Sequence, residues 1–371
     1  MLVQGKPFRT IWFDQRYSDR FYIIDQRQLP HSLEIATIKD VDTAVQAIGE
    51  MWVRGAPLIG ATAAWGMYLA ASQIPARCDS QFWFEEAYSK LLRARPTAFN
   101  LKWALDRMLE VLRHARDPDE AALIARRMAA HITEEDVQIN ASIGEHGLNL
   151  IKDIYERVQR PVNILTHCNA GWLATVDWGT ATAPIYKAKA EGIPVHVYVD
   201  ETRPRNQGAA LTTWELMNMD VPCTLITDNA GGHLMQKGKV DIVITGTDRV
   251  DRNGNVCNKI GTYLKALAAK HQGVPFYVAL PTGTIDWSMD NAFKDLTIEE
   301  RGEEEVLFIQ GKMKGKIAQV QIAPDGTKAE NPAFDVTPAD LVTGLITERG
   351  ICAATFEGMS NLYPEIGQDE R

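Results

Sequence analysis

The second half of the chain alternates short apolar, β-branched runs with longer stretches of helical spacing. Strands that alternate with helices pair in parallel, because each helix returns the chain to the same end of the sheet. We therefore predict a Rossmann-like α/β domain over residues 159–371, with stretches such as 172–191 and 207–219 as crossover helices. The predicted strands are 162–167, 195–200, 223–227, 241–245 and 276–280, with 318–323 as a sixth candidate.

The first half follows a different pattern. Alternating apolar and polar residues up to residue 30 predict a short strand hairpin. From residue 40 onward, apolar residues recur with helical spacing; Asp40 stands in the position of an N-cap and Pro57 opens the next helix. We predict a mainly helical N-terminal domain over residues 1–158, and a chain of 371 residues is long enough for two such domains.

The composition is that of an ordinary globular protein, with 45% apolar and 23% charged residues. A net charge of −9 argues against nucleic acid as the main partner. No stretch reaches the ~20 apolar residues of a membrane span, and the first residues have no long apolar core, so we expect neither a membrane partner nor a signal peptide. The five cysteines form no CxxC pair and cannot all be paired, which indicates reduced thiols in a cytoplasmic protein.

Polar side chains follow each of the five clearest strands. The carboxyl ends of parallel strands share one edge of the sheet, where open α/β folds bind their ligands. Turn chemistry alone also enriches aspartate and glycine at such positions. However, five consecutive strands lead to hydrogen-bonding residues here, which favours a small-molecule site. The segments are Thr166–Asn169, Asp200–Arg203, Asp228–Asn229, Thr247–Arg249 and Pro281–Thr284.

Three residues at this edge have both an ordinary and a functional interpretation. Cys168 is either a small residue in a strand-to-helix turn or an acid–base group, activated by the N-terminus of a following helix. His167 has no spaced set of possible co-ligands, so we expect no metal site and favour a structural role. Asp248 is a helix cap, a partner of Arg249 or Arg252, or a carboxylate placed for proton transfer beside Cys168.

Several basic residues stand where they can bind a phosphate. Arg54 and Gly55 precede a helix that a proline opens, and free backbone N–H groups with a guanidinium form a phosphate receptor. The same sequence is also an ordinary loop-to-helix junction. Arg95 precedes another proline, while Asn258 and Lys259 follow a tight turn at a further predicted helix start. No G-x-G-x-x-G motif follows a strand and no Walker A sequence occurs, so nothing in the sequence supports a nucleotide ligand.

A set of segments that follow one another over nearly the whole chain matches one family. They include "IDQRQLP" (24–30), "VRGAPLIG" (53–60), "RARPTAFNL" (93–101), "LTHCNAGWLATV" (165–176), "VYVDETRPRNQGAALTTWEL" (197–216), "GTDRVDRNGNVCNKIGTY" (246–263) and "NPAFDVTPADL" (331–341). Together they resemble the methylthioribose-1-phosphate isomerase family of methionine salvage. The wider superfamily includes ribose-1,5-bisphosphate isomerase and regulatory subunits of a translation-initiation exchange factor. The Cys-Asn-Ala-Gly and Gly-x-Asp-Arg segments point to the isomerases.

The resemblance implies a role for individual residues. The catalytic pair falls on Cys168 and Asp248. The string "PTGTID" (281–286) stands where the family more often has Pro-Leu-Ser-Thr-Ile-Asp, and it bears on substrate preference because it follows a strand at the same edge. Substrate contacts fall on Arg54, Gly55, Ala56, Arg95, Gln207, Asn258 and Lys259.

The resemblance also implies a reaction, the conversion of 5-methylthioribose 1-phosphate to the ribulose 1-phosphate by a homodimer without metal or organic cofactor. The phosphate ester blocks ordinary ring opening, so an acid must protonate the ring oxygen while hydrogen moves from C2 to C1. Asp248, protonated in an apolar pocket, is the implied acid. Cys168 is the implied carrier of the C2/C1 proton by way of a cis-enolate, with a direct hydride shift as the rival. The alternatives that the superfamily offers are a related substrate (5-deoxyribose 1-phosphate or ribose 1,5-bisphosphate) or a non-catalytic subunit that senses a sugar phosphate.

Overall fold

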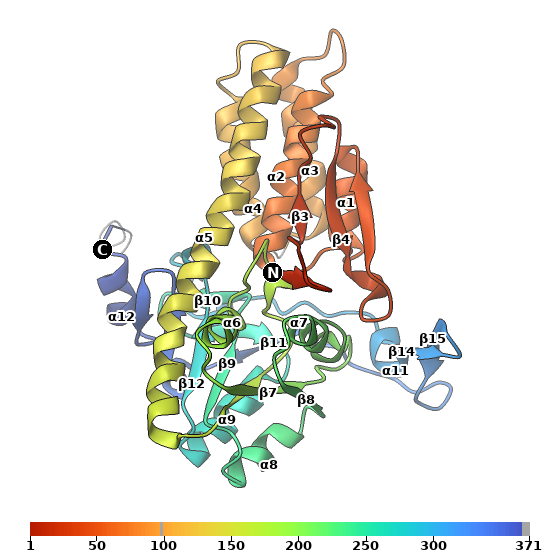
Figure 1. Ribbon diagram of the computed structural model, residues 1–371. Helices are drawn as coiled ribbons and strands as arrows, with labels where there is room; N and C mark the ends of the chain where they lie inside the picture. Colours follow the sequence, from red (N-terminus) through yellow and green to blue (C-terminus); the bar gives the residue numbers. More distant parts are fainter. Residues whose placement is uncertain (97–98, 366–371) are drawn as a thin grey trace. The chain divides into compact units, whose positions relative to one another are not determined.

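The computed structural model describes residues 1–96 and 99–365 (Figure 1). Within them the chain forms two compact units. Unit 1 comprises Met1–Ala141 and Gly171–Gly179, and unit 2 comprises Ser142–Ala170 and the residues from Thr180 onward. The long helix α5 (Pro118–Val158) contributes residues to both units. A boundary between two domains at residues 158 and 159 stays a prediction.

Unit 1 begins with two small antiparallel sheets. The first is a hairpin, and the second has the order β3-β4-β5, with β4 antiparallel to both neighbours. The predicted strand hairpin is therefore confirmed as β3 and β4, and β5 pairs with β4 as a third strand. The five strands are β1 (Leu2–Val3), β2 (Lys6–Pro7), β3 (Ile11–Trp12), β4 (Phe21–Asp25) and β5 (Glu34–Ile38), and the single turn η1 (Gln26–Gln28) follows β4.

From Val41 to Ala141, unit 1 is mainly helical, as predicted. The Asp40 carboxylate accepts a hydrogen bond from Thr43 N at 2.7 Å and caps the first helix. Helix α2 is buried on all sides, since it consists largely of alanine and other apolar residues and contacts α1, α3 and α4. Besides α5, the helices are α1 (Val41–Gly49), α2 (Ala56–Ser72), α3 (Ser80–Ala94) and α4 (Phe99–Leu112).

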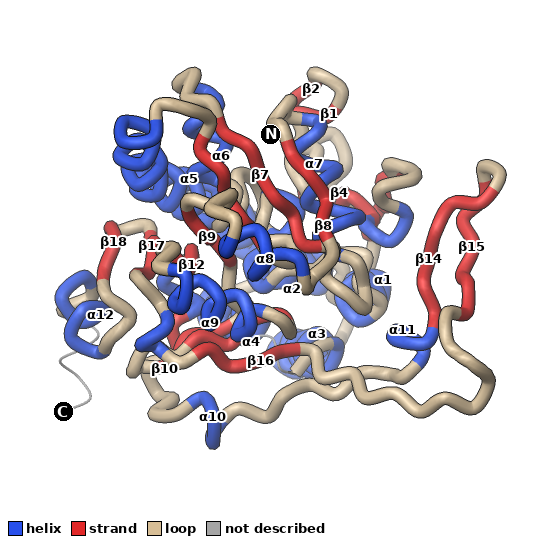
Figure 2. The backbone as a smooth tube through the Cα atoms, turned by 90° about the horizontal axis from the view of Figure 1, so that it is seen from below, coloured by secondary structure: helices blue, strands red, loops and turns tan. Residues whose placement is uncertain are grey.

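Unit 2 is built on a seven-stranded sheet of order β18-β17-β12-β9-β6-β7-β8, which Figure 2 shows from below. All neighbouring strands are parallel except β17 and β18. The five predicted strands are confirmed. β6, β9 and β12 are largely buried, and strands buried on both faces stand out as continuous apolar runs, whereas the edge strand β8 is partly exposed. The bounds are β6 (Val162–Thr166), β7 (Val195–Asp200), β8 (Cys223–Ile226), β9 (Ile242–Thr245), β12 (Phe276–Ala279), β17 (Gly344–Thr347) and β18 (Gly350–Cys352).

The helix predicted over residues 172–191 is wrong in its first half. Only α6 (Ala183–Ala190) is α-helical, and η2 (Trp172–Ala174) is a single 3-10 turn. The Thr175 hydroxyl donates to Asp177 O at 2.8 Å and accepts from Gly179 N at 3.1 Å, so this side chain offers the backbone an alternative to helical bonds. The helix predicted over 207–219 is confirmed as the π-helical turn η3 (Gly208–Thr212) and α7 (Thr213–Asn218). The other helical segments of unit 2 are α8 (Ala230–Gln236), α9 (Thr262–Gln272), η4 (Thr282–Thr284), α10 (Ala292–Asp295), α11 (Glu304–Leu307), η5 (Ala339–Leu341) and α12 (Phe356–Leu362).

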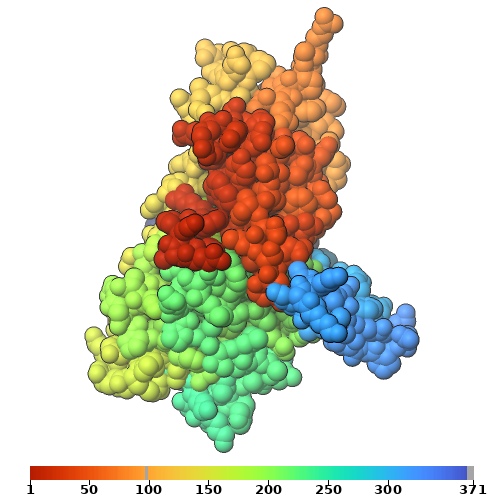
Figure 3. All heavy atoms as spheres, turned by 45° about the vertical axis from the view of Figure 1, so that its right-hand side comes forward, coloured from red at the N-terminus to blue at the C-terminus, as the bar shows by residue number. Residues whose placement is uncertain are grey.

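The strand predicted at 318–323 exists but does not belong to the parallel sheet. It is β15 (Lys316–Gln321), which pairs only with β14 (Phe308–Met313) in a hairpin that stands out from the surface in Figure 3. Its residues are mostly exposed, unlike those of a buried parallel strand, and the sixth parallel strand is β17. A further sheet of order β13-β10-β11-β16 comprises β10 (Arg249–Asp251), β11 (Val256–Lys259), β13 (Ile285–Asp286) and β16 (Phe334–Thr337).

No helix among the described residues is long and apolar enough to cross a lipid bilayer.

Candidate active site

The carboxyl ends of β6 and β9 form the centre of the candidate site. Taken in chain order, the parallel strands are arranged 3-2-1-4-5-6, with β6 and β9 as strands 1 and 4. The chain leaves β6 toward β7 on one side and leaves β9 toward β12 on the other. Two neighbouring strands whose connections diverge leave a crevice outside their carboxyl ends. Cys168 follows β6 and Asp248 follows β9, so both predicted catalytic residues come from this point of the sheet.

Gly246 allows the two segments to approach each other. A Cβ atom at this position would lie 2.5 Å from the Cβ of Ala170 and 3.3 Å from the Thr180 hydroxyl. Ala170 belongs to the segment that continues from Cys168, and Gly246 precedes Asp248 by two residues. The close packing of the Cys168 and Asp248 segments therefore depends on the absence of one methyl group.

The Cys168 thiol is buried and oriented by hydrogen bonds. The residue is 8% exposed and has a left-handed backbone, with φ of 62°. Its N–H donates to the Thr202 hydroxyl at 2.8 Å, and its thiol donates to Gln207 Oε1 at 2.9 Å. Two of the predicted site residues are thus in contact. The α-helix expected directly after Cys168 is not formed, since the next helical segment is the 3-10 turn η2, so the following segment does not supply the helix dipole that was expected to activate this thiol.

The loop that carries Gln207 is fixed from the end of β8. The two oxygens of the Asp228 carboxylate accept from Thr202 N at 2.7 Å and from Arg203 N at 2.8 Å. At the other end of the loop, any Cβ on Gly208 would overlap the backbone oxygen of Asp200, so only glycine fits there. The loop between β7 and η3 therefore holds Gln207 against the thiol.

Asp248 is half-buried, and its carboxylate has no hydrogen-bonding or ion-pairing partner among the described residues. Its backbone N–H donates to Cys257 O at 3.0 Å. The neighbouring cations Arg249 and Arg252 form ion pairs with other carboxylates, Asp286 at 3.4 Å and Asp290 at 3.2 Å, respectively. Burial raises the pKa of the neighbouring Cys257 thiol, which therefore stays neutral.

Asn258 and Lys259 lie on β11, whereas the helix they were expected to open, α9, begins three residues beyond Lys259. The buried Asn258 donates from Nδ2 to the Thr262 hydroxyl at 2.9 Å. The Lys259 ammonium lies 4.5 Å from the centre of the Phe334 ring. Gln207 and Lys259 line the same narrow gap in unit 2, whose other lining residues include Thr202, Arg203, Arg205, Arg301 and Glu305.

The remaining predicted contacts belong to unit 1. Arg54 is 7% exposed, and Gly55 is the N-cap of α2, with φ of 88°. A Cβ on Gly55 would overlap the backbone of Ala174, so the turn requires glycine. Ala56 is the first residue of α2, which presents its free backbone N–H groups at this end. Arg95 ends α3 as its C-cap, and Thr97 and Ala98, which follow in the same motif, lie outside the described residues.

A buried cluster beneath the site was not predicted. Asp200 is fully buried, with the His167 ring nitrogen Nδ1 at 2.8 Å and the Lys265 ammonium at 2.9 Å from its Oδ2. His167, Asp200 and Asp228 are close enough together to hold a metal ion. However, the Lys265 ammonium also donates to Asp228 O at 2.5 Å, so a cation of the protein already lies within the group. Nothing in the local sequence around Lys265 indicates this partnership.

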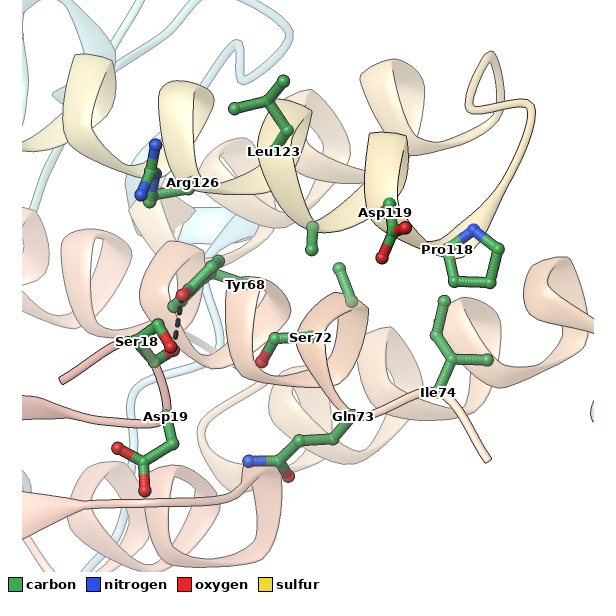
Figure 4. A pocket seen from close by; sticks show the side chains of 12 residues that line it. Ser18, Asp19, Tyr68, Ser72, Gln73, Ile74, Pro118, Asp119, Leu123 and Arg126 are labelled. Carbon is green, nitrogen blue, oxygen red and sulfur yellow. Dashed lines mark hydrogen bonds between the residues drawn. The ribbon is translucent and has the colours of Figure 1, made fainter. Parts of the chain in front are cut away.

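Unit 1 has a surface cavity of about 410 Å³ between α2 and the start of α5 (Figure 4). None of the predicted site residues lines it. The carboxylates of Asp19 and Asp119 line it together with Arg126, so it is poorly suited to a phosphate group. The Tyr68 hydroxyl, which also lines the cavity, already donates a hydrogen bond to Ser18 O at 2.5 Å.

Comparison with known proteins shows the family and the fold to which this chain is similar. A model described as the initiation factor 2 subunit family matches residues 52–354. Two crystal structures share the fold over nearly the whole chain. One is the translation initiation factor eIF-2B, subunit delta, from A. fulgidus, with 40% identity and a TM-score of 0.80 over 96% of this chain and 100% of that one. The other is 5-methylthioribose 1-phosphate isomerase from Pyrococcus horikoshii, with 39% identity and a TM-score of 0.84 over 98% and 97%.

Several similar sequences point to one group within that family. The methylthioribose-1-phosphate isomerase of Cereibacter sphaeroides is 58% identical over 99% of both chains. The protein of the same name from Sinorhizobium medicae is 57% identical over 98% of this chain and 100% of its own. The chain therefore belongs to the initiation factor 2 subunit family, in the group whose members are named methylthioribose-1-phosphate isomerase.

Proposed function

We propose that this chain is an aldose–ketose isomerase that converts 5-methylthioribose 1-phosphate to 5-methylthioribulose 1-phosphate, a step of methionine salvage. The identity of 58% to a protein of that name, over nearly the full length of both chains, is the observation that carries the proposal. The crevice at the ends of β6 and β9 supports it, because this is where an open parallel sheet binds a small ligand.

The reaction requires one bond cleavage and the movement of hydrogen. The bond from C1 to the ring oxygen breaks, and the ring oxygen gains a proton. The hydrogen on C2 moves to C1, and the C2 hydroxyl loses its proton as the ketone forms. Atoms and electrons balance without an oxidant, so the protein needs an acid at the ring oxygen and a group that handles hydrogen at C2 and C1.

We propose Asp248 as the acid and Cys168 as the group at C2 and C1. Asp248 suits the first role because no described residue engages its carboxylate, which leaves it available to a ligand. Cys168 suits the second because Gln207 Oε1, 2.9 Å from Sγ, fixes the direction of the thiol. A thiol held in one rotamer delivers or accepts a proton at a defined point, which is how positioning lowers a barrier. A direct hydride shift from C2 to C1 is the rival route.

The substrate phosphate needs positive charge and N–H donors. We propose Arg54, Arg95 and the start of α2 at Gly55 and Ala56 for this role, in keeping with the family resemblance. A helix N-terminus and a guanidinium both favour an anion. We further propose that Gln207, Asn258 and Lys259 contact the sugar phosphate from the gap beside Cys168, since Gln207 and Lys259 line it together.

A second candidate is a non-catalytic regulatory subunit. The 40% identity to a protein described as an initiation factor subunit favours it. Identities of 54–58% to proteins named as isomerases weigh more, and both Cys168 and Asp248 are present.

The test is a substrate panel. Purified protein is incubated with the 1-phosphates of 5-methylthioribose and 5-deoxyribose and with ribose 1,5-bisphosphate, and ketose formation is followed. We expect the highest kcat/KM with the methylthio substrate. Binding of a sugar phosphate without formation of any ketose would favour the regulatory subunit. A higher kcat/KM with another member of the panel would support an isomerase but contradict 5-methylthioribose 1-phosphate as its substrate.

We also propose that the protein acts in the cytoplasm as a homodimer and that unit 2 is Rossmann-like. The strand order 3-2-1-4-5-6 supports the last point. Light scattering of the purified protein tests the dimer.

A further inference from the structure

A network of buried hydrogen bonds ties the segment that carries Cys168 to helix α7. Glu215, on α7, is fully buried. Its Oε1 accepts a hydrogen bond from Asn169 Nδ2, and its Oε2 accepts one from the Tyr186 hydroxyl at 2.9 Å. A carboxyl group without such partners would be costly in the interior. Glu215 therefore holds Asn169, the residue next to Cys168, against α7.

The Thr212 hydroxyl, at the end of η3, bonds to the same segment. It accepts a hydrogen bond from Asn169 Nδ2 at 3.1 Å and donates one to the backbone oxygen of Cys168 at 2.7 Å. The Asn169 amide group has two hydrogens, and its contacts with Thr212 and Glu215 use both of them. Asn169 therefore points its donors into the protein, although it lies at the edge of the sheet where a ligand is expected.

The bond from Thr212 supports an unfavourable backbone conformation. Cys168 has a φ of 62°, in the left-handed region that residues with a Cβ atom seldom adopt. Such a conformation persists only where the surrounding structure determines it. Both backbone groups of Cys168 bond to threonine hydroxyls, the N–H to Thr202 and the oxygen to Thr212. These two bonds therefore fix the direction in which the thiol leaves the backbone.

The π-helical turn η3 allows one segment to hold both the backbone and the thiol of Cys168. Gln207, which accepts from the thiol, is the N-cap of η3, and Thr212 is its last residue. In an α-helix of about 3.6 residues per turn, residues i and i+5 face different sides. Here the Thr213 N–H donates to Gly208 O, the i→i+5 bond of a π-helix. This wider turn lets Gln207 and Thr212 reach Cys168 together, and π-helical turns are frequent at functional sites.

We propose that Thr212 and Glu215 are positioning residues for Cys168. They hold the Cys168–Asn169 segment against η3 and α7, so that the thiol meets Gln207 in one orientation. Both are fully buried, so neither touches the substrate. Their effect on turnover rests on the proposed isomerase function, whereas their effect on the thiol does not.

The first measurement compares two substitutions of Thr212. Thr212→Val keeps the volume but removes the hydroxyl, and it should lower kcat by ~10- to 100-fold, since a misplacement of ~1 Å costs ~10²-fold. KM should change by less than ~3-fold, because the change acts on a reacting group and not on substrate binding. Thr212→Ser keeps the hydroxyl but loses a methyl group, and it should recover most of kcat. A role in packing alone predicts the reverse order of the two variants.

Thr133→Val is the matched control. The Thr133 hydroxyl is also buried and forms the same kind of bridge, because it accepts from Trp65 Nε1 at 2.9 Å and donates to Ala129 O at 2.7 Å. This bridge lies within unit 1 and contacts no residue of the candidate site. Thr133→Val should therefore lower the melting temperature about as much as Thr212→Val does and leave kcat unchanged.

The second measurement needs no substrate. Iodoacetamide labelling of Cys168 is followed by mass spectrometry of the peptide that contains it, which separates this thiol from the other cysteines. Thr212→Val should speed the labelling by ~5-fold or more, because each lost hydrogen bond shifts a local opening equilibrium by roughly 2- to 13-fold. Thr133→Val and Thr212→Ser should label at nearly the wild-type rate.

Equal kcat for Thr212→Val and Thr133→Val, or a Thr212→Ser protein less active than Thr212→Val, would overturn the positioning role. Unchanged labelling of Cys168 in Thr212→Val would also overturn it. If the wild-type protein forms no ketose, the proposed function fails, and the labelling rates still decide whether the thiol is held in this way.

A second variant applies if Thr212→Val does not fold. Tyr186→Phe keeps the ring and removes only the hydroxyl that donates to Glu215. It should lower kcat by ~2- to 10-fold and speed the labelling of Cys168, since one hydrogen bond of the network is lost. A Tyr186→Phe protein with wild-type kcat and wild-type labelling would contradict the proposal.

Discussion

Replacing Gly246 by alanine tests whether the spacing of the Cys168 and Asp248 segments matters. The new Cβ would lie 2.5 Å from the Ala170 Cβ, whereas carbon atoms in contact prefer ~3.5–4.0 Å. The two segments must therefore separate by roughly 1 Å or more. A misplacement of ~1 Å at reacting groups costs ~10²-fold in rate, or ~2.7 kcal/mol in the activation barrier. Overpacking should also reduce the free energy of unfolding by ~1–3 kcal/mol.

The assay is ketose formation from 5-methylthioribose 1-phosphate, with chemical denaturation to follow stability. The stability control is Gly232→Ala on α8, whose Cβ would meet only the Ala268 Cβ at an ordinary 3.5 Å, so kcat should not change. Removing the clashing methyl group in the double variant Gly246→Ala/Ala170→Gly should recover most of the lost rate, a coupling that a double-mutant cycle measures. A fully active Gly246→Ala protein, or a double variant no better than the single one, would refute this account of the crevice.

Three further predictions concern single groups. Cys168→Ser should fold normally and lose at least ~10²-fold in kcat, the typical effect of a missing acid–base group, and near-normal turnover would reduce the thiol to a packing role. Arg54→Ala should weaken substrate and product binding by ~1.5–3 kcal/mol, as measured by calorimetry; a lower melting temperature with unchanged kinetic constants would make Arg54 structural. Desolvation raises the pKa of Asp136 from 3.8 to about 7, against the opposing bonds from Val176 N and Asn140. Its contribution to the free energy of unfolding should therefore be complete below pH 3.8 and be lost as the pH rises through about 7. Between these pH values the free energy of unfolding should fall by up to ~1.4 kcal/mol per pH unit in denaturation measurements, and Asp136→Asn should flatten this dependence. An unchanged pH dependence in Asp136→Asn would contradict the assignment.

The elements that the sequence predicts well are those whose cause is local. The buried strands of unit 2 are continuous apolar runs, and Asp40 caps α1 because its own carboxylate reaches Thr43 N. The helix wrongly extended back to residue 172 failed for two reasons: the Thr175 hydroxyl bonds the nearby backbone, and Gly171–Gly179 packs within unit 1. A pattern of spacing does not contain that tertiary contact.

The residues of the candidate site also fall into those that the sequence predicts and those that it does not. Cys168 and Asp248 could be placed at one sheet edge because topology alone brings strand ends together. The hydrogen bond from the thiol to Gln207 and the burial of Lys265 against Asp200 join residues 39 and 65 positions apart, respectively, across three-dimensional packing. Polar side chains of this kind look like ordinary surface residues in the sequence, so the cluster around His167 emerged only from the structure.

The most direct test of the central claim is the turnover and substrate affinity of Asp248→Asn, measured side by side. Asparagine keeps the size of the side chain and part of its hydrogen bonding but cannot deliver a proton to the ring oxygen. We predict nearly normal binding of 5-methylthioribose 1-phosphate by calorimetry and a kcat reduced by at least ~10²-fold, the pattern of a group that acts only in the transition state. An asparagine variant that forms the ketose at the wild-type rate would contradict the assignment of the crevice between β6 and β9 as the active site.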